Sequence, residues 1–171
     1  MFLDMINLVK VRKALLCGLL LLAFVLLQDI ALARVVILGV RPFITPIAVA
    51  AAGFFNGGVW GAVCGIAAGI ITDDALNGSA VMMTIIFPVI GFFSGALPLF
   101  LISRRFSSFA MISVGAMLIT VFCQMFRYLV FTDTAILPML LTALMQIVWS
   151  VPFIFAVYFP FKAASGLDLS K

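Results

Sequence analysis

Long apolar runs, separated by short breaks, occupy almost the whole chain. They lack the alternation of apolar and polar residues, over about ten residues, that is typical of strands in a membrane barrel. Their length and uniform apolar character predict helices. Six segments can be marked, at roughly 14–33, 42–55, 58–72, 80–102, 108–131 and 135–161.

The composition places these helices in a membrane. The chain of 171 residues is 66% hydrophobic and 9% charged, and it contains neither Glu nor His. A soluble domain is nearer half apolar and a quarter charged, so this chain cannot cover a water-facing surface. We therefore expect an all-α integral membrane protein, with one transmembrane domain over 1–171 that forms a six-helix bundle.

The second and third segments, 42–55 and 58–72, are short for a membrane span. Fifteen helical residues rise only about 22 Å, against a bilayer core of about 30 Å. The two could instead form one helix over 42–72, which would give five spans. The distribution of Lys and Arg favours six spans with both termini cytoplasmic over five spans with either orientation. Neighbouring helices would then shield the short pair from lipid.

The first segment also has some features of a signal peptide. Lys10, Arg12 and Lys13 precede the apolar run, and the residues at 31–33 read Ala-Leu-Ala, as at a cleavage site. The run over 14–27 is at the upper length limit for the apolar region of such a peptide. We interpret this segment as the first membrane span.

Glycine recurs at every fourth residue through the third segment. Gly57, Gly61, Gly65 and Gly69 form this glycine ridge, and the next step falls on Asp73. Helices associate in membranes through close van der Waals contact, which small residues permit. A four-residue repeat drifts by about 40° per step, so the ridge is inclined and favours a steep helix crossing.

A second pair of glycines, Gly91 and Gly95, lies in the fourth segment after Pro88. We expect the third and fourth helices to meet closely through these two faces, or each to meet another helix. The glycines therefore serve packing within the bundle or, alternatively, the binding of a partner protein.

Few polar side chains interrupt the apolar segments, and each is a candidate anchor. Asp73 and Asp74 are adjacent, and neighbouring helical residues point about 100° apart, so they do not form a paired carboxylate site. Either one lines the bundle, or both belong to a solvated turn. Arg127 is expected to pair with Asp73 or Asp29. The predicted polar anchors are Gln28, Asp29, Asp73, Asp74 and Arg127.

The sequence offers no pattern for catalysis or metal binding. It has no nucleophile elbow, no P-loop, no HExxH motif and no histidine to act as a base. Cys17, Cys64 and Cys123 lie inside apolar runs without CxxC spacing, which disfavours a disulfide framework or a metal site. We expect no enzyme activity, no cofactor and, because the basic residues are spread along loops, no nucleic-acid partner.

Four stretches together resemble the rod shape-determining MreD family of bacteria, and the resemblance covers nearly the whole chain. They are LLQ at 26–28, RPFITPIAVAAAGFF at 41–55, GGVWGAVCGIAAGIITD at 57–73 and ALMQIVWSVPFIFAVYFPFK at 143–162. The third of them carries the repeat G-x-x-x-G-x-x-x-D that members of the family share.

The resemblance implies a non-catalytic scaffold subunit of the cell-elongation complex, with several spans in the bacterial inner membrane. It also implies binding to MreC, and through MreC a connection between MreB filaments and the peptidoglycan synthases, RodA and its partner transpeptidase. The family's fold is similar to the six-helix substrate-binding subunits of energy-coupling-factor transporters. The alternative function is therefore vitamin binding, although few polar residues are present to furnish a ligand cavity. A third interpretation, another kind of transporter, is disfavoured by the lack of charge pairs within the spans.

Overall fold

The computed structural model describes residues 8–30, 32, 40–75, 81–100, 105–131 and 136–166. Apart from an isolated bridge residue at Val40, the regular secondary structure of these residues is helical, which confirms the all-α class predicted from the apolar runs. Seven helices follow one another along the described chain: α1 (Leu8–Ile30), α2 (Thr45–Asn56), α3 (Gly58–Ala75), α4 (Met82–Phe100), α5 (Phe106–Phe131), α6 (Ile136–Ser150) and α7 (Pro152–Ser165).

The break between α2 and α3 is made by one glycine. Gly57 has φ of +95°, a backbone conformation that residues with a Cβ atom rarely adopt. Its N–H donates to the Gly53 carbonyl, so α2 closes and α3 begins one residue later. The second and third apolar segments are therefore two helices, and not one helix over 42–72.

The last apolar segment differs from the single element expected over 135–161. α6 ends at Ser150 and α7 begins at Pro152, and the axes of the pair are bent by 43°. Proline has no N–H to donate and its ring collides with the preceding turn, which accounts for the break at this point. If α6 and α7 are counted as one broken element, the seven helices correspond to the six predicted segments.

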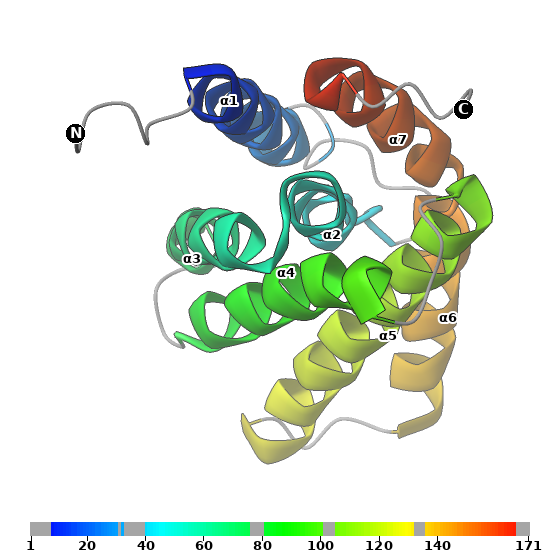
Figure 1. Cartoon of the computed structure of the whole chain (residues 1–171). Helices are drawn as coiled ribbons and strands as arrows, with labels where there is room; N and C mark the ends of the chain where they lie inside the picture. Colours follow the sequence, from blue (N-terminus) through cyan, green and yellow to red (C-terminus); the bar gives the residue numbers. More distant parts are fainter. Residues whose placement is uncertain are drawn as a thin grey trace.

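α2 lies at the centre of the bundle. Figure 1 shows it enclosed by neighbouring helices, and it contacts α1, α3, α4, α5 and α7. All its residues from Thr45 to Phe55 are buried. Its length of 12 residues corresponds to about 18 Å, much less than a bilayer core. The helices around α2 shield it, and its alanines at 48 and 50–52 let them approach closely.

Aromatic rings pack against one another in the core where α2 meets α5 and α7. Phe54 and Phe55 of α2 lie 5.5 Å and 6.1 Å, between ring centroids, from Phe109 of α5. Tyr158 of α7 lies 5.7 Å from Phe55 and 5.3 Å from Phe109. These separations are those of interacting aromatic pairs, so α5 and α7 are fixed against the C-terminal end of α2.

α5 and α6 extend beyond the rest of the bundle (Figure 1). Among the described helices, α6 contacts α5 and α7. Its outward residues are strongly exposed, with Leu137 at 79% and Leu141 at 61%. Such an apolar surface is unfavourable in water and favourable in a bilayer.

Two described helical stretches, Arg12–Ile30 and Phe106–Phe126, are long and apolar enough to cross a membrane. The bent pair Leu137–Ser150 and Pro152–Ser165 qualifies as a third if it acts as one span. These lengths are consistent with the predicted membrane protein.

Candidate functional site

Three glycines of the ridge lie against the backbone of α4. A Cβ atom on Gly65 would lie 2.5 Å from the carbonyl oxygen of Phe87 and 2.6 Å from the nitrogen of Pro88. One on Gly69 would lie 2.5 Å from the Cα atom of Thr84. No real Cβ atom makes such contacts, so these positions hold α3 and α4 closer than any larger side chain would allow.

The third of these glycines, Gly61, lies where α2, α3 and α4 converge. A Cβ atom on Gly61 would meet the Gly91 carbonyl oxygen of α4 and would lie 2.5 Å from the Cα atom of Gly53 in α2. A Cβ atom on Gly53 would meet the Gly91 carbonyl and the hydroxyl of Ser94. Three backbones therefore touch at this glycine junction, which comprises Gly53, Gly61 and Gly91.

The close approach predicted for the third and fourth helices is thus present, and it continues to the end of α4. A Cβ atom on Gly95 would lie 2.6 Å from the Cα atom of Gly58, at the start of α3. Since α4 covers Gly61, Gly65 and Gly69, a partner helix cannot use this face while the bundle is intact. The alternative that the ridge binds a partner protein is not supported by this geometry.

Gly57 differs from the rest of the ridge. A Cβ atom built on it would meet nothing within 4 Å, although its backbone carbonyl carbon lies against Gly95 of α4. Its positive φ requires glycine for the turn between α2 and α3 instead. Gly57 therefore has a role in the turn that the sequence did not indicate, in addition to its backbone contact with Gly95.

The Asp73 carboxylate accepts hydrogen bonds from the first turn of α4. Its Oδ1 accepts a hydrogen bond from the Met83 N–H at 3.1 Å. Its Oδ2 accepts from the N–H of Thr84 at 2.8 Å and from the Thr84 hydroxyl at 2.7 Å. The first N–H groups of a helix have no partner within it, and a carboxylate is favoured there by the helix dipole. Asp73, at the end of α3, therefore acts as a cap for α4.

The other charged anchors do not join this cap in the described structure. Asp74 is exposed, as expected if only one of the two adjacent acids lines the bundle. Asp29 is half-buried at the end of α1. The side chain of Arg127 lies outside the described part, so its pairing with Asp73 or Asp29 stays a prediction.

Gln28 connects α1 to the start of α2. Its side-chain amide donates to the Pro42 carbonyl at 3.0 Å and accepts from the Ile44 N–H at 2.6 Å. The neighbouring Phe43 N–H donates to the hydroxyl of Ser150, at the end of α6, at 2.9 Å. These buried bonds satisfy backbone groups that would otherwise be costly inside a membrane protein.

Sequence reasoning missed Gly53, Ser94 and Ser150. Gly53 extends the four-residue repeat of the ridge by one step, and this spacing could have indicated it. Ser94 and Ser150 carried no such signal, because serine in an apolar helix often bonds only to its own backbone. Ser150 does so, donating to the Gln146 carbonyl, and additionally accepts from the Phe43 N–H of a distant segment.

No group of three His, Cys, Asp or Glu side chains that could hold a metal occurs among the described residues. The three cysteines are free thiols. The hydroxyls of Thr45 and Ser113 are buried without a hydrogen-bond partner in the described structure, on α2 and α5 respectively.

A scan against protein-family models found no match for the chain. Searches of curated proteins and of solved structures likewise found no similar protein.

Proposed function

We propose that this protein is a non-catalytic membrane scaffold of the bacterial cell-elongation complex, with MreC as its partner. The proposal follows from the MreD-like stretches, above all the glycine repeat that ends on Asp73. Its structural support is one observation. The glycines of the ridge and the junction, together with the polar anchors Gln28 and Asp73, join helices of the bundle to one another, as a rigid scaffold requires.

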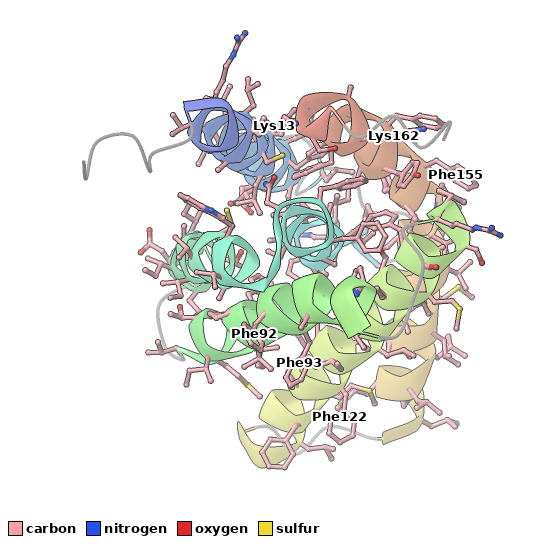
Figure 2. All side chains as sticks on the ribbon, in the orientation of Figure 1. Lys13, Phe92, Phe93, Phe122, Phe155 and Lys162 are labelled. Carbon is pink, nitrogen blue, oxygen red and sulfur yellow. The ribbon has the colours of Figure 1, made fainter. Side chains whose placement is uncertain are left out.

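The outer faces of the bundle are left for lipid and partner helices. Phe92 and Phe93 of α4 and Phe122 of α5 point away from α2 (Figure 2), and Phe122 is 70% exposed. Because α4 covers the ridge, we place the contact with a single-span partner on these outer apolar faces. Packing between membrane helices would supply the affinity.

In this proposal the chain crosses the inner membrane six times, with α6 and α7 acting as one broken span and both termini in the cytoplasm. α2, with 12 residues, is too short for an unaided span, and its contacts with α1, α3, α4, α5 and α7 compensate for this. RodA, its partner transpeptidase and MreB filaments would be reached through MreC.

Co-purification tests this function. The tagged full-length chain, extracted in a mild detergent, is expected to retain co-expressed MreC and not the transmembrane coupling subunit of an energy-coupling-factor transporter. A matched tagged membrane protein of similar size controls for nonspecific retention. Retention of the coupling subunit without MreC would overturn the proposal.

Vitamin binding remains the alternative because of the unpartnered hydroxyls of Thr45 and Ser113. Buried hydroxyls without partners can orient a polar ligand. Mass spectrometry of small molecules released from the purified, denatured protein distinguishes the two functions. A stoichiometric vitamin would favour the alternative, and its absence together with bound MreC would favour the scaffold.

A further inference from the structure

Most of the described charged side chains separate by sign to opposite ends of the bundle, and Arg41, a cation at the acidic end, is the exception. Arg12 and Lys13 lie in the first turns of α1, whereas Asp29 lies near its other end, about 24 Å away along the axis. Asp73 and Asp74 lie at the end of α3. α2 runs from the end that holds Asp29 to the opposite end, and α3 runs back, so both acids lie at the same end as Asp29. Lys13 lies beside Gly166, after α7, so the end of α7 lies at the basic end.

Two further cations, Arg105 and Lys162, belong to the helices that meet here: Arg105 directly precedes α5, and Lys162 lies in the last turn of α7. The Phe106 ring, next to Arg105, lies 4.9 Å from the Tyr158 ring of α7. Lys162 follows Tyr158 by four residues, so it lies one turn further along the same face of α7. Arg105 is exposed and Lys162 is half-buried. No acidic side chain of the described part lies at this end.

An apolar track leads from this pair of cations toward the middle of the bundle. Phe155, Phe159 and Lys162 recur at helical spacing on α7, and the two phenylalanines are 54% and 63% exposed. Phe106 stacks on Phe155 with ring centroids 4.8 Å apart. Figure 2 shows Phe155 beside the start of α5 and Lys162 further along α7.

We propose that this α5–α7 seam, comprising Arg105, Phe106, Phe155, Phe159 and Lys162, binds an anionic phospholipid. The two cations hold the phosphate of the headgroup, and an acyl chain lies along the phenylalanines. The two side chains supply +2 charges, and the C-terminus of α7 offsets about half a charge. The remainder, about +1.5, is complementary to a headgroup that carries one negative charge.

The site depends on the membrane placement of the chain but not on its partner. Basic pockets between helices on the cytoplasmic side of a membrane protein commonly bind anionic headgroups. The proposed topology puts the α5–α7 seam on that side, at the depth where the headgroups begin.

Native mass spectrometry of the full-length protein, released from detergent, tests the proposal. The probes are phosphatidylglycerol, zwitterionic phosphatidylethanolamine and inorganic phosphate. The wild type is expected to retain phosphatidylglycerol in preference to phosphatidylethanolamine. K162Q is expected to bind phosphatidylglycerol about fivefold more weakly, and R105Q/K162Q about 25-fold more weakly, with the charge-preserving K162R close to wild type.

R41Q is the matched control, because Arg41 is an exposed cation at the opposite end. It loses the same charge as K162Q and is expected to leave retention unchanged. Equal loss in R41Q, equal retention of both lipids by the wild type, or full binding by R105Q/K162Q would overturn the site. Displacement of phosphatidylglycerol by millimolar inorganic phosphate would also overturn it, since the seam would then be a small-anion site.

Misfolding of the variants is tested separately by thermal unfolding in phosphatidylglycerol and in phosphatidylethanolamine. The wild type is expected to gain more stability in phosphatidylglycerol than K162Q does, whereas R41Q should gain as much as the wild type. An equal gain in all three proteins would contradict the proposal.

Discussion

At the scale of single residues, the Asp73 side chain connects α3 to α4 through hydrogen bonds. Its carboxylate accepts three bonds from the first turn of α4, and the side chain is only 8% exposed. A helix N-terminus buried without acceptors leaves N–H groups unpaired, and each such group costs about 1–3 kcal/mol. Asp73 therefore contributes more to the bundle than its single charge suggests.

We predict that Asp73→Ala lowers the free energy of unfolding by about 1–3 kcal/mol, because it leaves the Met83 and Thr84 N–H groups without their acceptor. Asp73→Asn keeps one acceptor oxygen and should lose less. Unfolding of the purified protein by heat or denaturant in detergent measures both. The exposed Asp74→Ala is the control, and equal losses at 73 and 74 would contradict the cap.

Gln28 provides a second test at this scale. Gln28→Leu keeps the volume of the side chain but leaves the Pro42 carbonyl and the Ile44 N–H unpaired, so we expect a loss of about 2 kcal/mol in the same unfolding measurement. The control is Gln124→Leu, at a half-buried glutamine of α5. A Gln28→Leu variant as stable as Gln124→Leu would show that water replaces these bonds.

The sequence indicated which polar residues anchor the helices, but it did not indicate their hydrogen-bond partners. Gln28 and Asp73 stand out because polar groups are rare in these apolar runs. Their partners are backbone groups of segments that come near only in the folded chain. From charge alone, the partner that could be predicted for Asp73 was Arg127. Ser150 stayed unnoticed for the same reason, since its distant partner is the Phe43 N–H.

At the scale of helices, the glycine ridge determines how α3 and α4 cross. Its four-residue spacing was enough to predict close helix packing, because small residues at that period let the backbone of another helix approach closely. The spacing could not show that Gly57 belongs to a turn. The spacing could have indicated Gly53 of α2, one step before Gly57, but not that Gly53 meets Gly61 and Gly91, because the break at Gly57 interrupts the helical phase.

We predict that Gly65→Ala destabilises the protein by about 1–3 kcal/mol, because its Cβ atom would overlap the Phe87 carbonyl and push α4 away. Gly115→Ala in α5 is the matched control, since a Cβ atom there meets nothing within 4 Å. It should be neutral or stabilise by up to about 1 kcal/mol through helix propensity. Unfolding midpoints of the two variants that shift in the same direction would contradict the packing described for the ridge.

At the scale of the whole molecule, a short central helix is possible only because longer helices surround it. α2 is buried on every side, whereas α1 and α5 are long enough to reach across a bilayer. The apolar runs predicted this architecture in outline. They could not predict the bend at Pro152, because proline is tolerated in many membrane helices and its effect depends on how neighbouring helices satisfy the freed backbone groups.

The distribution of charge predicts how the whole bundle is oriented. The basic end, with Arg12, Lys13, Arg105 and Lys162, should face the cytoplasm, because Lys and Arg near span ends are retained there. A phosphatase or fluorescent reporter fused after residue 133, between α5 and α6, should therefore report the periplasmic side, and one fused after residue 171 the cytoplasmic side. Reporters on the same side at both positions would mean that the bent pair α6–α7 re-enters the membrane instead of crossing it.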